Sequence, residues 1–423
     1  MFHDPPDSSS AVCRPYRAYE RRPFDRARCT LCGQCLHRCP VMHLPLARAR
    51  QEMERLLAGQ DSPVLRACTS CLACNLFCPE DCRPANLILD RWHEAYLQEG
   101  LPARAAYFLP HARPNFRTEV LARMPPGERE TVARWRRNEP AHEFLYPGCN
   151  LITTPYLTFS RLFEGIEVRG GLDYCCGEML FRMGLYEALE QVAHRLTEWF
   201  HHLQARRVYL VCTAGLNMLR NILPQFGADF AGIEFLPYLQ VVLDRLQSGD
   251  LGAIRPLEWT VTLQDSCHTR VVEPDLARLP RRVLAAIGVE TRQTPHSRET
   301  QLCCGIGGGF SHASAYHPFA LLLSARATSR DHRRVPAGAT CVYCSGCLEM
   351  MSVARFADPN RRPVVHLLEL LQWAIGETPR RRQGTLARQF IWGTVRHQFP
   401  RLLSRQRFWL PTLPLEPDPE EAT

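Results

Sequence analysis

Lysine is absent from this chain of 423 residues, so all 51 of its Lys and Arg positions are arginine. A Walker A phosphate loop needs a lysine, and so does a Schiff base with a carbonyl substrate or with pyridoxal phosphate. The absence therefore excludes these classes of site. The arginines give a net charge of +8, but they are scattered and match none of the common nucleic-acid-binding modules. We expect no nucleic-acid partner.

Long apolar runs are missing as well. No stretch approaches the roughly 18 consecutive apolar residues of a membrane-spanning helix, and the opening residues, MFHDPPDSSS, contain no hydrophobic core of a secretory signal. We therefore expect a cytoplasmic protein without a membrane span of its own. Peripheral association with the inner membrane face would come through a partner or a surface helix.

Cysteine, by contrast, is abundant, with 20 residues. In a reducing compartment this abundance favours metal ligands over disulfides. The distribution is uneven, because nine cysteines fall between Cys29 and Cys82 and the next is Cys149. A cysteine-dense head thus precedes a longer body.

The length of the chain predicts more than one domain. Apolar residues are spaced for helices at 44–57 and 84–100 in the head, and at 178–204 and 314–330 in the body. Short apolar runs between the body helices, at 144–146, 208–211 and 260–263, predict strands and hence α/β layers. The predicted fold is α+β and multidomain, with an N-terminal tail at 1–25, an α-helical head at 26–100, a connection at 101–142, two tandem α/β repeats at 143–258 and 259–376, and a basic tail at 377–423.

The head contains the same cysteine motif twice. Cys-x-x-Cys-x-x-Cys-x-x-x-Cys-Pro begins at Cys29 and begins again at Cys68. Three thiolates at this spacing wrap around one face of a [4Fe-4S] cubane, and the fourth cysteine, before proline, reaches the other cluster. Zinc is the alternative, although zinc sites usually use two paired Cys-x-x-Cys knuckles. We predict one cluster at Cys29, Cys32, Cys35 and Cys78 and another at Cys68, Cys71, Cys74 and Cys39, with Cys13 and Cys82 outside the pattern.

The interval between the two motifs has room for a full helix, which is more than a compact two-cluster ferredoxin contains. The head resembles the α-helical ferredoxin domain of succinate dehydrogenase iron-sulfur subunits and of the C subunit of heterodisulfide reductase. This resemblance implies a helical electron-transfer domain.

The body carries a repeated cysteine pattern. Cys149 is matched by Cys267, and Cys175-Cys176-Gly177 is matched by Cys303-Cys304-Gly305. The long separation between the two copies implies a duplicated domain and not a solenoid. The predicted strands are each followed within a few residues by a cysteine, so their ends would present cysteines to a common crevice.

The body resembles the cysteine-rich CCG domains of the B subunit of heterodisulfide reductase. Residues 26–375 together resemble the D subunit, which is the fused form with a helical ferredoxin ahead of the CCG body. Glycolate oxidase, lactate-utilisation and anaerobic glycerol-3-phosphate dehydrogenase iron-sulfur subunits share this architecture. In the reductase, each complete motif is associated with a noncubane [4Fe-4S] cluster held by five cysteines.

The resemblance assigns ligands in both repeats. The second repeat is complete, with Cys267, Cys303, Cys304, Cys344 and Cys347, although the pair Cys341 and Cys344 has the same spacing and stays open. In the first repeat Gly215 stands where the fifth cysteine is expected. The remaining four, Cys149, Cys175, Cys176 and Cys212, would hold a further cluster or none.

Catalytic candidates follow from the second repeat. Substrate is expected to react near Cys303 and Cys304, and His268 is either a proton donor or a structural, hydrogen-bonded histidine. The glycines at 305–309 do not have the GxGxxG spacing, so we expect them to let backbone amides approach the cluster sulfurs and not to bind a nucleotide.

The resemblance implies an iron-sulfur redox subunit that passes electrons through the two cubanes to a CCG-domain cluster. It would act in a larger oxidoreductase complex on a disulfide or another sulfur or small organic substrate. The alternative is a non-catalytic relay between a flavin dehydrogenase and a membrane quinone partner. The expected partners are a flavoprotein or a membrane quinone-reactive subunit.

The C-terminal tail is predicted to form a basic amphipathic helix. It combines Arg380-Arg381-Arg382 with apolar residues between Phe390 and Leu403. Such a helix lies on an anionic membrane, in a partner's groove, or against its own body.

Overall fold

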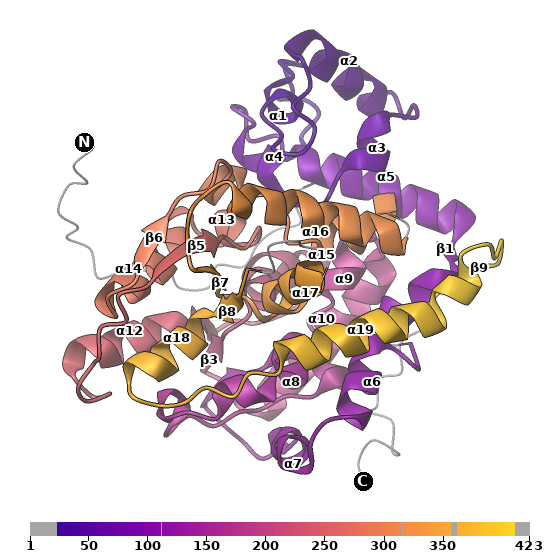
Figure 1. Ribbon diagram of the computed structural model, residues 1–423. Helices are drawn as coiled ribbons and strands as arrows, with labels where there is room; N and C mark the ends of the chain where they lie inside the picture. The colour runs from indigo at the N-terminus through magenta and orange to yellow at the C-terminus, as the bar shows by residue number, and fades with distance from the viewer. Residues whose placement is uncertain (1–22, 111, 315–316, 357–361, 411–423) are drawn as a thin grey trace.

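The computed structural model describes residues 23–110, 112–314, 317–356 and 362–410. Figure 1 shows a helical head at one end of the molecule and a larger body of helices and strands below it. The head comprises the helices α1 (Gln34–His37), α2 (Leu46–Leu57), α3 (Pro63–Ala67), α4 (Ala73–Leu76) and α5 (Pro84–Glu99).

Helices α2 and α5 build the core of the head. Helix α2 buries Ala49, Met53 and Leu56 on one side, at the spacing of an amphipathic helix. Helix α5 begins with Pro84, which suits a first turn because its missing N–H is not needed there, and it buries Trp92. The helices predicted at 44–57 and 84–100 are thus confirmed.

Helix α5 also packs the head against the body. The Tyr186 hydroxyl donates to Asp90 Oδ1 at 2.7 Å, and the same tyrosine ring stacks on His93 with centroids 4.4 Å apart. His93 Nδ1 lies 2.8 Å from the carbonyl oxygen of Gly184. The head is therefore docked on the body through polar and aromatic contacts.

Two parallel sheets form the centre of the body. The first has the order β2-β3-β4 and the second β6-β5-β7-β8. The three strands β5, β7 and β8 repeat the order of β2, β3 and β4, as the duplicated cysteine pattern predicts. The strands are β2 (Glu143–Tyr146), β3 (Arg207–Leu210), β4 (Glu234–Pro237), β5 (Thr260–Gln264), β6 (Glu290–Arg292), β7 (Ala339–Val342) and β8 (Val364–His366).

Helices cover these sheets, and the central strands are correspondingly buried. Strand β7 is buried along its whole length, as is usual for parallel strands packed on both faces. The α-helices of the body are α8 (Gly148–Thr153), α9 (Glu178–Phe181), α10 (Tyr186–His202), α11 (Thr213–Asn217), α12 (Tyr238–Ser248), α13 (Thr269–Val272), α14 (Arg278–Ala286), α15 (Ile306–Gly309), α16 (Pro318–Arg333), α17 (Ser345–Phe356) and α18 (Leu367–Ala374). Short 3-10 or π turns join them: η1 (Ala103–Phe108), η2 (Pro155–Thr158), η3 (Arg161–Phe163), η4 (Leu172–Tyr174), η5 (Met218–Ile222), η6 (Leu223–Phe226), η7 (Pro274–Ala277), η8 (Arg298–Thr300), η9 (His312–Ser314) and η10 (Phe399–Arg401).

The single helix predicted at 178–204 is two helices, α9 and α10. The chain bends at Gly184, whose φ of +72° is a left-handed conformation that glycine adopts readily. A Cβ atom there would lie 2.7 Å from the backbone nitrogen of His93. The break therefore lets the body approach helix α5 closely.

The segment expected as a connection, 101–142, is folded. It forms β1 (Leu101–Pro102), η1, α6 (Phe116–Ala122) and α7 (Pro126–Trp135). The tail forms α19 (Gln383–His397) and β9 (Arg407–Phe408), and β9 pairs antiparallel with β1. Figure 1 shows α19 running along the body toward β9. Up to residue 410 the tail thus packs on its own body, which is one of the predicted alternatives.

The predicted fold class, a helical head followed by α/β units, is confirmed. Across the described ranges we find no helix with both the length and the apolar character needed to cross a membrane. Residues 1–22, which include Cys13, and residues 411–423 lie outside the described part of the chain.

Candidate functional site

Both cysteine motifs of the head fold into the same loop. Leu31 and Gly33 have φ values of 54° and 74°, and Ser70 and Leu72, at the equivalent positions of the second motif, have φ values of 48° and 62°. Residues other than glycine seldom adopt this left-handed conformation, so the surroundings must stabilise it. Each loop leads into a short helix, α1 or α4, that carries the third cysteine of its motif.

The first set of thiols combines three cysteines of one motif with the last cysteine of the other. Burial raises the pKa of Cys35 to about 12, and the neighbouring thiols of Cys78, Cys32 and Cys29 contribute to this rise. The backbone N–H of Cys82 donates to Cys78 Sγ at 3.3 Å. Cys82 therefore lies beside this set without belonging to the motif.

The second set is built in the same crossed manner. Burial, followed by the nearby Cys71 thiol, raises the pKa of Cys39. Burial also raises the pKa of Cys74, together with Cys68, Cys71, Cys35 and Cys39. Because Cys35 is among these neighbours, the two sets lie next to each other.

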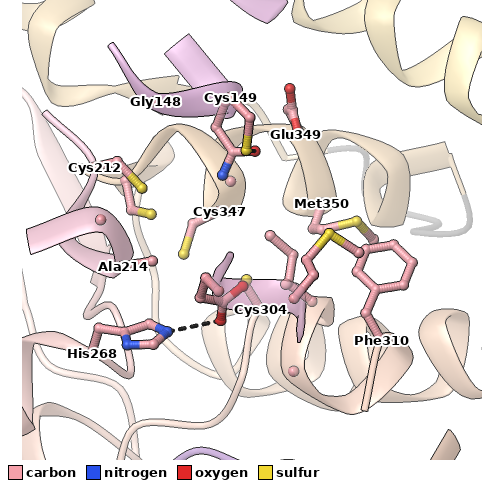
Figure 2. A pocket seen from close by; sticks show the side chains of 18 of the residues that line it. Gly148, Cys149, Cys212, Ala214, His268, Cys304, Phe310, Cys347, Glu349 and Met350 are labelled. Atoms are coloured by element: carbon pink, nitrogen blue, oxygen red, sulfur yellow. Dashed lines mark hydrogen bonds and ion pairs between the residues drawn. The ribbon is translucent and has the colours of Figure 1, made fainter. Parts of the chain in front are cut away.

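One cavity of the body is lined by cysteines from both repeats. It contains about 810 Å³ of atom-free space, counting its mouth. In Figure 2, Cys149, Cys212, Cys304 and Cys347 surround this space. All nine cysteines predicted as ligands in the repeats line it: Cys149, Cys175, Cys176, Cys212, Cys267, Cys303, Cys304, Cys344 and Cys347. We call it the thiol cavity.

The ends of the parallel strands bring these cysteines together. Cys149 follows β2, Cys212 follows β3, Cys267 follows β5 and Cys344 follows β7. In α/β sheets the carboxyl ends of the strands are where ligands bind. The common crevice expected from the sequence is present.

Cys344 lies where the two repeats meet, since its thiol is hydrogen-bonded to both Cys212 and Cys347. Hydrogen bonds from Cys303 and Cys347 hold the pKa of Cys304 at about 6. Cys341 lies within β7, is fully buried, and is not part of the cavity wall. Of the two candidate pairs, only Cys344 and Cys347 both face the cavity.

A buried arginine joins this cavity to the head. Arg182, with a side chain 2% exposed, donates to Cys267 Sγ at 3.3 Å and to the Ser70 carbonyl oxygen at 2.8 Å. It also donates to Ser70 Oγ at 2.7 Å and forms an ion pair with Glu178. Burial raises the pKa of Glu178, but Arg182 and His268 outweigh it and hold that pKa at about 2.

His268 is held at both ring nitrogens. Its Nδ1 lies 3.1 Å from Asn217 Nδ2, and its Nε2 lies 2.9 Å from Glu178 Oε1 and 2.8 Å from Arg182 Nη2. The dashed line in Figure 2 marks a contact of this histidine. The amide nitrogen can only donate, so Nδ1 accepts, whereas Nε2 faces both an acceptor, Glu178 Oε1, and a donor, Arg182 Nη2. The arrangement fits the structural alternative, and a catalytic role for His268 stays a prediction.

Two further charged groups line the cavity. Arg117, from α6, is 3% exposed and donates to Met179 Sδ at 3.0 Å. Burial raises the pKa of Glu349 to about 7, although Thr153 and Arg117 lower it. Sequence reasoning missed both groups. Arg117 lies in the supposed connection, where no motif points to it, whereas Glu349 aligns with Asn217 of the first repeat and could have been found as a repeated polar position.

The sulfur atoms have the surroundings that iron-sulfur ligands need. The N–H groups of Gly305 and Gly307 donate to Cys303 Sγ at 3.4 and 3.1 Å, and that of Ser70 donates to Cys68 Sγ at 3.3 Å. Such N–H···S bonds stabilise thiolates that bind iron-sulfur clusters. Within the described residues, no three Cys, His, Asp or Glu side chains close around one point as the ligands of a single ion do. The thiols and the N–H groups that donate to them fit the chemistry of iron-sulfur ligands.

Two parts of the chain match known protein families. A 4Fe-4S dicluster domain matches residues 23–80, and a cysteine-rich domain of the CCG type matches residues 261–352. The chain is an iron-sulfur protein whose head matches a 4Fe-4S dicluster domain and whose second repeat matches a cysteine-rich CCG domain. The first α/β repeat lies outside both matches, in keeping with its missing fifth cysteine at Gly215.

The chain is also similar to several curated proteins. The chain is 25% identical to the EtfAB:quinone oxidoreductase of Syntrophomonas wolfei subsp. wolfei, over 57% of this chain and 36% of that protein. It is 26% identical to the probable iron-sulfur-binding oxidoreductase FadF of Bacillus subtilis, over 57% of this chain and 37% of that protein. It is 25% identical to the D subunit of the dihydromethanophenazine:CoB–CoM heterodisulfide reductase of Methanosarcina barkeri, over 54% of this chain and 57% of that protein. The matches thus span between about one third and just over half of each relative.

Proposed function

We propose that this chain is an iron-sulfur redox subunit of a larger oxidoreductase complex, in which electrons pass through the head to the thiol cavity. One contact carries the proposal: Cys267 of the cavity wall packs against a small buried cluster of the head that consists of Cys71, Ala73 and Phe77. Arg182 spans the same boundary with donors on both sides. Electrons entering the head would therefore meet the cavity across a packed, water-poor contact.

We assign the thiols as follows. Cys29, Cys32, Cys35 and Cys78 hold one [4Fe-4S] cluster and Cys39, Cys68, Cys71 and Cys74 hold another, and their mutual proximity supports this crossed pairing. Cys267, Cys303, Cys304, Cys344 and Cys347 hold a noncubane [4Fe-4S] cluster. Cys149, Cys175, Cys176 and Cys212 are the candidate ligands of a further cluster in the first repeat.

The substrate we favour is a disulfide or a related sulfur compound that reacts at Cys303 and Cys304. Reducing a disulfide consumes two electrons and two protons, breaks one S–S bond and releases two thiols. The head would supply the electrons, coming from a flavoprotein partner. His268 and Glu349 are titratable groups of the cavity wall that could serve such a reaction.

A relay without its own substrate is the second candidate. It is favoured by Gly215, which leaves the first repeat without its fifth thiol, and by the relative named for transfer between EtfAB and quinone. In this case the partners are a flavin dehydrogenase and a membrane quinone-reactive subunit.

Anaerobic purification followed by iron and sulfide determination and electron paramagnetic resonance tests the first proposal. We expect at least three clusters per chain and turnover of small disulfides with a reduced viologen dye. Full cluster content without turnover, together with stable capture of a flavoprotein, would instead select the relay. Colourless protein loaded with zinc would refute both.

A further inference from the structure

Helix α19 has two apolar sides, and only one of them is covered. Its inner side buries Leu386, Ala387 and Phe390 against the body. On the outer side Trp392 is 70% exposed, Val395 40% and, just beyond the helix, Phe399 43%. Steps of three and four residues place these three side chains on one stripe of the helix surface.

The stripe continues onto neighbouring elements. Phe319 at the start of α16 is 53% exposed and its ring centroid lies 6.2 Å from that of Phe399. Leu323, one turn further along α16, is 65% exposed, and Leu403 after η10 is 96% exposed. We call the surface formed by Phe319, Leu323, Trp392, Val395, Phe399 and Leu403 the outer face.

A pocket opens in the outer face between α16 and α19. It contains about 580 Å³ of atom-free space, counting its mouth, and its wall includes Phe319, Ile391, Val395 and Phe399. Its floor includes Phe310 and Phe390, which also line the thiol cavity. A thin aromatic layer thus separates the outer face from the cysteines.

The outer face is surrounded by positive charge. From 378 to 410 the chain contains eight arginines and no aspartate or glutamate, and the segment 317–330 of α16 has no acidic residue either. Exposed arginines flank the apolar stripe at Arg388, Arg396, Arg401 and Arg405. Some other arginines of the tail are paired with acidic residues, as Arg381 is with the buried Glu369.

We propose that the outer face docks on a lipid bilayer rich in anionic headgroups. A bilayer matches both the charged and the apolar part of the outer face. Its lipid phosphates pair with arginine, and the boundary of its hydrocarbon region accepts Trp392, Phe399 and Leu403. A nucleic acid offers phosphates but no place for exposed aliphatic side chains. Contiguous exposed apolar surface ringed by charge marks an interaction site and not a resting surface.

Docking in this way brings the apolar pocket to the acyl-chain region. The pocket then takes an apolar tail, and the aromatic layer of Phe310 and Phe390 stands between that tail and the thiol cavity. The inference does not rest on the proposed redox function, since it uses only exposure, shape and charge.

Co-sedimentation with lipid vesicles tests the proposal with the full chain, purified with its clusters. We expect binding to vesicles of phosphatidylglycerol and phosphatidylcholine in equal amounts, and much weaker binding to pure phosphatidylcholine, with binding lost at high salt. The double substitution Trp392→Ser and Leu403→Ser is expected to weaken binding by roughly tenfold or more. Arg388→Gln and Arg396→Gln should each weaken it by roughly fivefold.

Matched controls separate docking from misfolding. All four residues are exposed, so iron content and the thermal unfolding midpoint should stay unchanged in these variants. The conservative variant Trp392→Phe should retain most of the vesicle binding of the wild-type protein. Trp259→Ser, at an exposed tryptophan outside the outer face, should leave vesicle binding unchanged. Equal binding of all variants, or no binding to anionic vesicles, would overturn the proposal. A change in self-association without a change in vesicle binding would show a protein–protein surface and overturn it as well.

Discussion

Arg182 offers the sharpest test of the link between head and cavity. Its guanidinium donates to Cys267 Sγ at 3.3 Å and to Ser70 at 2.8 and 2.7 Å. A positive charge beside a cluster ligand stabilises the more negative, reduced state, so removing it lowers the reduction potential. We therefore predict that Arg182→Gln lowers the midpoint potential of the cluster that we propose Cys267 helps to hold.

The magnitude follows from the lost hydrogen bond. A hydrogen bond to a charged group contributes about 1.5–3 kcal/mol. We take about half of the upper value, about 1.5 kcal/mol, as the part by which this hydrogen bond favours the reduced over the oxidised cluster. Losing it changes the equilibrium between the two oxidation states about tenfold, which is about 59 mV for one electron. A titration followed by electron paramagnetic resonance should resolve this shift, while the cluster of Cys29, Cys32, Cys35 and Cys78 keeps its potential.

Stability has to be controlled in this experiment. Without Arg182, the buried Glu178 carboxylate would lose its ion-pair partner. Breaking a buried ion pair lowers the free energy of unfolding by about 3–5 kcal/mol. The double substitution Arg182→Gln and Glu178→Gln removes both charges and should fold better. Arg195→Gln is the matched control, because Arg195 is also buried but donates to the Asp173 carbonyl oxygen and is not part of the thiol cavity wall. Unchanged potentials in a folded, fully loaded Arg182→Gln variant would refute the reasoning, and in the double variant the loss of the Glu178 carboxylate should offset part of the shift.

Three further predictions use other residues. Cys347→Ser should lower the iron content of the purified protein, whereas Cys341→Ser should not, because only Cys347 faces the cavity; equal losses would show that Cys341 is a ligand. Cys71→Ser should remove about four irons per chain, with Cys82→Ser as a control that keeps them, and iron analysis would contradict the assignment if both behaved alike. Burial lowers the pKa of His332 from 6.5 to about 4, so the unfolded chain takes up a proton between these values and stability falls as pH drops from about 6.5 to 4. His332→Gln should reduce this loss of stability by about 3 kcal/mol. The free energy of unfolding of cluster-free wild-type and variant protein, measured with denaturant at each pH, tests this. Parallel pH dependences of the two proteins would contradict it.

The cysteine spacing carried most of what could be predicted. Thiols that bind one cluster must recur at fixed intervals, so the crossed sets around Cys35 and Cys74 and the paired repeats were visible without a structure. The strand ends near Cys149 and Cys267 were equally visible, because short apolar runs precede both. Periodicity alone also placed α2 and α5 within two residues at each end.

The buried charged residues near the cysteines, by contrast, have no recurring spacing by which the sequence could reveal them. Arg182 acts through a single side chain that reaches Ser70, more than a hundred residues away, and no local pattern encodes that distance. Arg117 reaches the cavity from a segment whose prolines and arginines indicated a mere connection. The bend at Gly184 was missed because one glycine within an otherwise helical pattern is compatible with a continuous helix.

The pairing of β1 with β9 has a mechanical consequence. Leu101 and Phe408 are partners across this ladder, so the end of the described chain holds the segment that immediately follows α5. On its other flank the same helix is anchored by Tyr186. A head secured on two sides cannot swing between a loading and an unloading position, as tethered carrier modules do. If electrons pass from the head to the thiol cavity as proposed, the rate of this transfer should therefore not depend on solvent viscosity.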